Sequence, residues 1–242
     1  MGKWSPMHQP GLALLALIGV ALVGAAPAHG APSFYGTSGL FATPVAAVAP
    51  PGAWSLGSNY VGRNYRPGAS SISQGTVANF FTLTLFPRLE ITAVLTNYEG
   101  KLGTRNLNHG LTPDYDLGGY TVDRTASAQW LAFPQRGYRP ALAFGLRDFL
   151  GRPAKHLQAQ YAVMSLNRGH LTLSAGAGTL ALRGPFGGAE YALTPRVSAI
   201  AEGLHGQANG GLRLVPLKDV QLDMALMGFR SLGGGLSYRR RF

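Results

Sequence analysis

Hydrophobic and polar residues alternate along most of the chain beyond about residue 53. Between Val220 and Leu226 the large apolar side chains occupy even positions, whereas Gln221 and Asp223 occupy odd positions. Residues 89–93 repeat this scheme. A period of two gives an extended chain one apolar and one polar face. No stretch of this part has the spacing of an amphipathic helix, so the pattern predicts β-strands.

The alternation divides the chain into about twelve segments. Most are close to the ~9 to 11 residues that a tilted strand needs to cross a bilayer. The predicted strands span residues 53–62, 76–86, 89–98, 121–133, 139–149, 155–166, 170–176, 186–193, 196–204, 209–215, 219–228 and 232–242.

The connections form a second pattern, because tight turns follow every second strand. They lie at residues 86–88, 167–169, 194–196 and 216–219, and the longest loops, 63–75 and 99–120, belong to the opposite set. The longer connection at 133–139 departs from this contrast. Short turns on one rim and long loops on the other are typical of outer-membrane barrels. We therefore predict an all-β fold: a transmembrane, antiparallel, up-and-down β-barrel of about twelve strands, whose closure leaves no strand edge unpaired in lipid.

The N-terminal region predicts a signal peptide over residues 1–30. Lys3 and His8 precede an apolar stretch that is shorter than the ~20 residues of a membrane-spanning helix, and small residues with Pro27 follow it. Cleavage after Ala28 and cleavage after Gly30 both fit. Residues 31–52, rich in Pro, Ala and Gly, show no periodicity and are interpreted as a lead-in segment to a barrel over residues 53–242.

The last strand ends in Phe242, with Tyr238, Leu236 and Gly234 on the same face. A terminal aromatic residue on an amphipathic strand is typical of the signal that barrel-insertion machinery recognises, so we assign this role to Phe242. Arg240 also falls on this face, and its stem can reach the interface at a strand end.

The charge balance suggests an anionic partner, since 21 Lys and Arg stand against 10 Asp and Glu. Nucleic acid is not expected, because the basic residues are scattered singly apart from residues 239–241. The chain has no cysteine, which excludes disulfides, thiolate zinc sites and a cysteine nucleophile.

Charged residues that share the polar face of the strands are candidate lumen residues if the apolar face meets lipid. Two interpretations remain open: an ion-pair network that only rigidifies the wall, or a field of excess Arg and Lys that attracts an anionic polysaccharide. The candidates are Glu90, Arg147, Glu190, Glu202, Arg213, Asp223, Arg239 and Arg241.

No pattern indicates catalysis, a metal site or a cofactor, and we expect the protein not to be an enzyme. The four histidines beyond the signal peptide have no metal-ligand spacing. Residues 36–39 lack the final glycine of a nucleophile elbow, and residues 176–178 do not complete a dinucleotide fingerprint. A lipid-modifying set of His170, Ser174 and Glu190 can be drawn, but no spacing selects it.

Several motifs resemble the YjbH family of outer-membrane barrels associated with exopolysaccharide production and export. They follow the family's order over most of the chain beyond the signal peptide, although many members are several times longer. They are the Gly-Leu-Phe-Ala-Thr-Pro element at 39–44, Asp123-Arg124, the Arg-Pro-Ala to Arg-Asp-Phe strand at 139–149, residues 184–191 and Ala201-Glu202.

The resemblance implies a non-enzymatic accessory of exopolysaccharide assembly or export in the outer membrane of a Gram-negative cell envelope. The implied partners are outer-membrane lipid, the barrel-insertion machinery and, for the transport role, anionic polysaccharide and polysaccharide-export proteins. Two alternatives stay open: a general porin or purely structural barrel, and a soluble secreted β-sandwich that binds carbohydrate.

Overall fold

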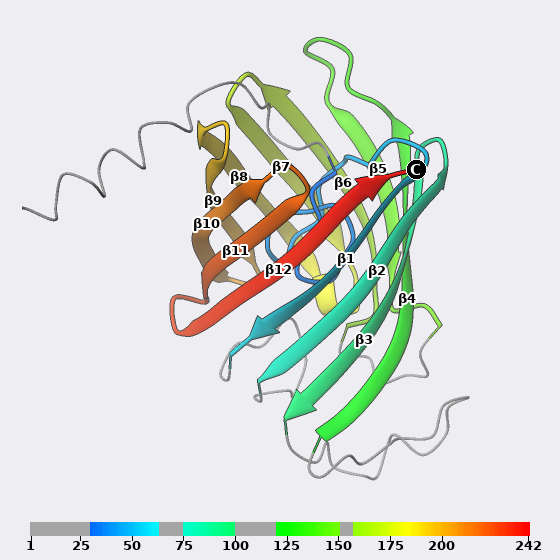
Figure 1. Ribbon diagram of the computed structural model, residues 1–242. Coiled ribbons are helices and arrows are strands. Elements are labelled where there is room, and N and C mark those ends of the chain that lie inside the picture. Colours follow the sequence, from blue (N-terminus) through cyan, green and yellow to red (C-terminus); the bar gives the residue numbers. More distant parts are fainter. Residues whose placement is uncertain (1–29, 63–74, 100–119, 151–156) are drawn as a thin grey trace, which may run out of the picture.

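A computed structural model describes residues 30–62, 75–99, 120–150 and 157–242 of the 242-residue chain. These residues form one closed antiparallel barrel in which every strand pairs with its neighbours in sequence and β12 pairs with β1 (Figure 1). The strands are β1 (Ala53–Val61), β2 (Thr76–Phe86), β3 (Leu89–Glu99), β4 (Tyr120–Phe133), β5 (Ala141–Arg147), β6 (Ala159–Arg168), β7 (Leu171–Gly178), β8 (Gly184–Thr194), β9 (Val197–Leu204), β10 (Gln207–Leu217), β11 (Val220–Met227) and β12 (Ser231–Arg241).

The closure of the sheet confirms the predicted barrel. The first and last strands are joined by a continuous register that runs from Ala53 opposite Arg241 to Val61 opposite Gly233. A β-sandwich would need two separate sheets, so that alternative is excluded. One short 3₁₀ turn, η1 (Leu180–Leu182), precedes β8, and the part of the chain described holds no helix that is long and apolar enough to span a membrane.

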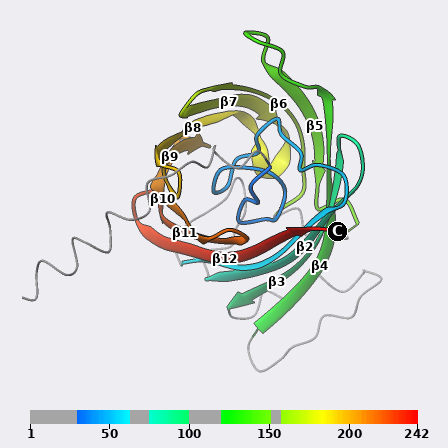
Figure 2. The same ribbon diagram turned by 45° about the horizontal axis from the view of Figure 1, so that its top comes forward.

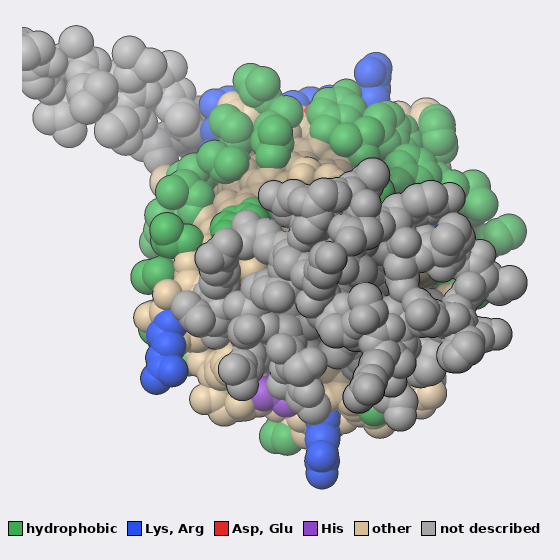
Figure 3. All heavy atoms as spheres, turned by 90° about the horizontal axis from the view of Figure 1, so that it is seen from below, with side chains coloured by type: hydrophobic (Ala, Val, Ile, Leu, Met, Phe, Trp, Pro, Cys, Tyr) green, Lys and Arg blue, Asp and Glu red, His purple; other side chains and the backbone are tan. Residues whose placement is uncertain are grey.

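The outer face of the wall is apolar. Large hydrophobic side chains point outward on nearly every strand, and from below they surround much of the wall (Figure 3). The inward positions carry many Ala, Ser and Thr residues instead. The exposed set includes Leu56, Tyr60, Phe81, Ile91, Leu95, Trp130, Phe144, Leu146, Met164, Leu173, Tyr191, Leu212, Met224, Leu226 and Leu236, which we call the apolar belt. This is the alternation of a barrel whose exterior faces lipid.

The two rims differ as the sequence indicates. The tight turns between β2 and β3, β6 and β7, β8 and β9, and β10 and β11 lie on one rim, together with the start of β1 and the end of β12. We call this the short-turn rim. The β4–β5 connection, whose length departs from the pattern, belongs to the same rim and forms a hairpin that projects beyond it (Figure 1). Most of the predicted signal peptide and the two longest loops lie outside the described residues, as do His109 and His156.

Residues 30–49, which we call the plug, lie inside the barrel (Figure 2). Gly30 lies against Ala49, and residues 50–52 are tied to the short-turn rim through hydrogen bonds from Gly52 to Thr84 and from Phe242 to Gly52. The plug therefore enters and leaves the lumen by the same rim. The segment interpreted as a lead-in forms no regular strand or helix. Its composition did not indicate that it lies inside the barrel.

Candidate functional site

The plug is a compact irregular loop that is held partly by its own backbone. Phe34 N–H donates to Phe41 O, Leu40 N–H to Thr43 O and Val45 N–H to Ser38 O, at 2.8, 2.9 and 3.1 Å. Many of its other backbone groups have no partner within the loop. A buried backbone group without a hydrogen bond is costly, so these groups require partners from the wall. The plug contributes no charged side chain of its own, because residues 30–52 contain no Asp, Glu, Lys, Arg or His.

Glu202 on β9 binds backbone N–H groups at the tip of the plug. Its carboxylate accepts hydrogen bonds from Ala42 N–H at 2.9 Å, from Thr43 N–H at 3.0 Å and from the Thr43 hydroxyl at 2.8 Å. Asn209 on β10 donates a further bond at 2.8 Å. The carboxylate is buried, and these donors stabilise it.

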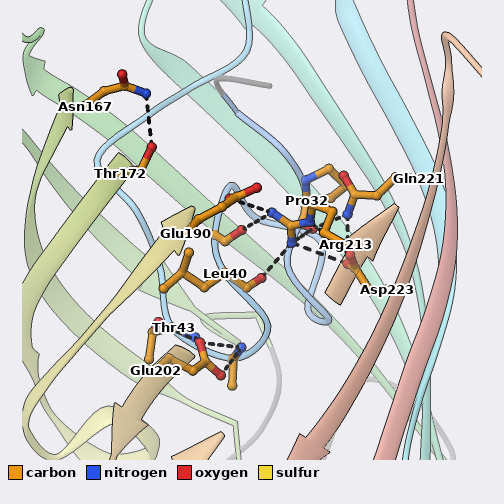
Figure 4. Close-up of polar contacts among 12 residues, drawn as sticks. Pro32, Leu40, Thr43, Asn167, Thr172, Glu190, Glu202, Arg213, Gln221 and Asp223 are labelled. Carbon is orange, nitrogen blue, oxygen red and sulfur yellow. Dashed lines mark hydrogen bonds and ion pairs between the residues drawn. The ribbon is translucent and has the colours of Figure 1, made fainter. Parts of the chain in front are cut away.

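Arg213 on β10 binds carbonyl groups of the plug (Figure 4). Its guanidinium donates to the carbonyl oxygens of Pro32, Gly39 and Leu40 at 3.4, 3.3 and 3.1 Å. The same group pairs with Asp223 on β11 and Glu190 on β8, at 2.9 and 3.2 Å. One planar group with five donors thus connects three wall strands and two parts of the plug.

Arg147 at the end of β5 makes a related contact. It donates to Ala42 O at 3.1 Å, and its guanidinium carbon lies 4.7 Å from the centre of the Tyr35 ring. Burial raises the pKa of the Tyr35 phenol, and the nearby Arg147 charge opposes this only partly. Tyr35 therefore stays neutral while its ring faces the cation, an arrangement that stabilises a desolvated guanidinium.

Glu90 on β3 binds the first half of the plug. Its two carboxylate oxygens accept hydrogen bonds from Ser38 N–H and from the Ser38 hydroxyl, the latter at 2.7 Å. Close by, the Thr82 hydroxyl on β2 donates to Gly36 O at 2.8 Å. Acidic wall residues thus bind plug N–H groups, while wall donors bind plug carbonyls.

Uncharged wall residues complete this pairing. Gln129 on β4 donates to both Val45 O and Ala47 O, at 3.0 and 2.8 Å. Asn59 and Gln221 donate to Phe34 O and Pro32 O, and Ser165 accepts from Ala46 N–H. Sequence reasoning selected charged residues only and missed these. They occupy the same alternate, inward-facing strand positions as the charged residues, and this pattern in the sequence could have identified them.

An apolar cluster surrounds the tip of the plug. Phe34 and Phe41 are fully buried, with ring centres 5.5 Å apart. Leu40 joins them. The wall residues of this cluster come mainly from the inner face toward the long-loop rim and include Ile200, Leu204, Met227, Leu157 and Leu182. Burial of such side chains contributes about 1.5 to 3 kcal/mol each, so the plug is fixed by apolar packing as well as by hydrogen bonds.

Six of the eight candidate residues are at least largely buried in the lumen, and each contacts the plug or joins the Arg213 cluster: Glu90, Arg147, Glu190, Glu202, Arg213 and Asp223. Arg239 is only partly buried at the short-turn rim. Arg241 is exposed and donates to Pro51 O at 3.1 Å. Phe242 is exposed beside the same rim, where its proposed recognition by insertion machinery stays a prediction.

A cavity of about 210 Å³ remains between the plug and the wall. It is lined on the plug side by residues 45–48 and on the wall side by Gln135, Ser165, Asn167, Thr172 and Glu190, among others. Asn167 and Thr172 are bonded to each other at 3.0 Å (Figure 4).

The weaker catalytic patterns do not assemble. Ser174 points into the lumen and donates to Pro44 O, whereas His170 is exposed in a rim turn. Glu190 is engaged with Arg213. In the described ranges no group of three or more His, Asp or Glu residues could hold a metal ion.

Comparison with known proteins agrees with the sequence motifs. A family model described as "Exopolysaccharide biosynthesis protein YbjH" matches residues 31–238, which include the plug and nearly all of the barrel. No curated protein matches the chain in a sequence search. Among solved structures, an outer membrane channel from Pseudomonas putida F1 aligns with 14% identity and a TM-score of 0.39, over 81% of this chain and 97% of that one, a similarity too low to indicate a shared function. On the extent of the family match, the chain belongs to the YjbH family of exopolysaccharide biosynthesis proteins.

Proposed function

We propose that this protein is an outer-membrane barrel, closed by its own plug, that acts as a non-enzymatic accessory in the assembly or export of an exopolysaccharide. The observation that carries the proposal is the occupied lumen. The family is associated with exopolysaccharide. In this chain the inward charged side chains bind the plug, an uncharged segment of the same chain. Membership of the family supports a role with polysaccharide, and the plug explains how the barrel is closed.

The membrane placement is supported by the wall. A closed sheet leaves no unpaired backbone edge for the bilayer to solvate. The apolar belt would expose side chains such as Leu226, Met224 and Phe144 to water in a soluble protein. Both features are explained if the outer face lies in lipid, and the Gram-negative outer membrane is where such barrels are inserted.

The plug argues against a general porin. Barrels of 16 to 18 strands leave an aqueous channel, and a narrower barrel has less room to spare. Here the lumen of a twelve-stranded barrel also contains Phe34, Leu40 and Phe41, all fully buried. Releasing the plug would remove the N–H groups that Glu90 and Glu202 bind and the carbonyl groups that Arg213 binds, so the closed state is the stable one.

An anionic polysaccharide is the partner best matched to the short-turn rim. On this rim Lys218, Arg239, Arg240 and Arg241 gather at one place, where the only acidic residue beside them in the lining is Asp219. Lys218, Asp219 and Arg239–Arg241 line a hollow of about 240 Å³ beside Ala49 and Pro50, where the plug leaves the lumen. A basic surface of this kind raises the local concentration of a polyanion by its field.

The role is tested by deletion and complementation. A strain that lacks the protein should secrete less exopolysaccharide, and the wild-type chain should restore it. A Lys218→Gln/Arg240→Gln/Arg241→Gln variant should restore less, whereas Arg196→Gln, which removes a basic residue elsewhere on the rim, should restore fully. Unchanged secretion in the deletion strain would overturn the proposal.

Conductance separates the proposed accessory from a porin. In planar bilayers the wild-type protein should show little steady current. A variant in which the plug is weakened, such as Glu202→Gln/Arg213→Met, should conduct in proportion to the time the plug spends outside. A large wild-type current that an anionic glycan does not change would favour the general porin.

A further inference from the structure

We infer that the short-turn rim carries a binding site for one anionic glycerophospholipid, in a groove on the outside of the barrel between β4, β5 and β6. The inference rests on the membrane placement proposed above and adds a ligand and a site to it. The groove encloses about 610 Å³, and its lining includes Arg88, Arg136 and Arg139 together with Phe133, Leu142 and Met164.

The cationic end of the groove is built by two turns. Arg136 and Arg139 exchange backbone hydrogen bonds of 3.2 and 3.0 Å across the β4–β5 hairpin. Residues that oppose each other in this way place their side chains on the same face of a hairpin. Arg88 belongs to the neighbouring β2–β3 turn, whose backbone accepts a hydrogen bond from Leu131 N–H at 2.8 Å. Three arginines therefore converge on one side of the rim.

The hairpin is fixed in place, so the site does not have to form on binding. Gln135 bonds Asn167 near the end of β6 twice, donating to its backbone oxygen at 2.9 Å and accepting from its N–H at 2.7 Å. The Arg168 guanidinium at the end of β6 lies 3.6 Å from the centre of the Tyr138 ring. This cation–π contact is a second link between the β4–β5 hairpin and β6. A preorganised site loses less conformational entropy when a ligand arrives.

The three arginines are available to an anion. Within the described part of the chain, none of them has an ion pair or a side-chain hydrogen bond, and the groove lining contains no Asp or Glu. All three are exposed. Guanidinium groups bind phosphate oxygens in a bidentate manner, so a phosphate at this place would be held by several donors.

The other end of the groove selects for acyl chains. Phe133 is 65% exposed and Met164 51% exposed. Met164 belongs to the apolar belt, and Phe133 extends this belt toward the short-turn rim beyond Trp130 and Phe144. A soluble polyanion would pair with the arginines but would leave the exposed Phe133 and Met164 side chains uncovered. A phospholipid places its phosphate at the bilayer interface and its chains along the belt, so one molecule matches both ends.

The test uses Trp130 as a reporter, because this residue lies on β4 three positions before Phe133 and faces outward. The chain has three tryptophans, so a Trp4→Phe/Trp54→Phe variant leaves Trp130 alone. This variant is reconstituted in vesicles that contain phosphatidylglycerol or phosphatidylcholine brominated in the acyl chain. Fluorescence quenching then reports which lipid lies against the groove.

We expect quenching to show that phosphatidylglycerol is preferred over phosphatidylcholine by about fivefold or more. One basic contact at the interface contributes about 1 kcal/mol, which corresponds to about this ratio of affinities. Arg88→Gln/Arg136→Gln/Arg139→Gln in this background should bring the ratio close to one, while Arg196→Gln should leave it unchanged. Unaltered mobility on unheated gels checks that each variant is folded.

The outcomes separate the two proposals. Equal quenching by both lipids, or a preference that survives the triple substitution, overturns the lipid site and leaves the membrane placement intact. A preference that a soluble anionic polysaccharide abolishes identifies a glycan site and also overturns the inference. Absence of quenching by either lipid contradicts the membrane placement itself.

Discussion

Arg213 and Asp223 face each other across the β10–β11 register, and the salt bridge between them, 2.9 Å from Nε to Oδ1, is covered by the plug. Asp223 also accepts a hydrogen bond from Gln221, which in turn donates to Pro32 O. The pair is therefore part of one network that joins the wall to both halves of the plug. Removal of either member leaves a buried charge without its partner.

Arg213→Met should lower the free energy of unfolding by about 3 to 5 kcal/mol, because Asp223 and Glu190 both lose their cation in a buried setting. Urea titration of the folded protein in detergent micelles measures this change. Arg213→Met/Asp223→Asn should recover part of the loss, since it removes one of the two stranded carboxylates. A loss below about 1 kcal/mol, in the range of an exposed pair, would contradict the network.

Glu202→Gln should loosen the tip of the plug. An amide presents an NH₂ group where the carboxylate accepts hydrogen bonds from Ala42, Thr43 and Asn209, at a cost of about 2 kcal/mol. Chymotrypsin should then cleave the plug at its aromatic residues faster than in the wild type. Glu190→Gln, which alters one contact to Arg213, is the matched control and should change the rate less. Equal rates in both variants would show that the Glu202 contacts do not hold the tip.

A disulfide should lock the plug to the wall. Ala46 N lies 2.8 Å from Ser165 Oγ, so cysteines at these two positions are close enough to be joined, and the chain has no other cysteine. Ala46→Cys/Ser165→Cys should form an intramolecular bond that changes gel mobility until reductant is added. In the conducting background described above, oxidation should close the channel and reduction should reopen it. The single Ala46→Cys variant should respond to neither treatment.

Gly36→Ala should displace the plug. Gly36 has φ +85°, and a Cβ there would lie 2.7 Å from side-chain atoms of Phe80 and Thr92. Strain and overlap together should cost about 2 to 4 kcal/mol. Gly137→Ala is the control: its φ is +56°, no atom lies within 4 Å of the added Cβ, and the cost should stay near 1 kcal/mol. Similar unfolding free energies for the two variants would argue against close packing of the plug.

Met224→Arg should destabilise the inserted barrel by about 2 to 4 kcal/mol, because this outward position lies midway along β11. Leu217→Arg, at the β10–β11 turn, should cost about 0 to 1 kcal/mol, since the charge can reach the interface there. Unfolding from vesicles gives both values. Equal effects at the two depths would mean that the outer face does not lie in a bilayer.

Much of the barrel could be predicted from the sequence, because strand formation and facing depend on neighbouring residues. The period-two alternation from Val220 to Leu226 placed Asp223 inward and Met224 outward, as the structure has them. Strand ends shifted by a few residues where bulges alter the register, as between Leu214 and Leu217. Arg241 was placed in the lumen by the same parity, but it lies at a strand end beyond the enclosed part of the barrel and is exposed.

The sequence alone determined the number of strands, the two faces of the wall and the two rims, since each depends on local alternation and turn chemistry. Only the tertiary structure decided that residues 30–49 fill the lumen and that the inward charges bind this segment. The plug has no periodicity, and its partners are remote along the chain, from 25 residues between Phe34 and Asn59 to 189 between Pro32 and Gln221. Closure of the barrel brings these groups together, and the unpaired backbone of an irregular segment then needs the hydrogen bonds that the wall provides.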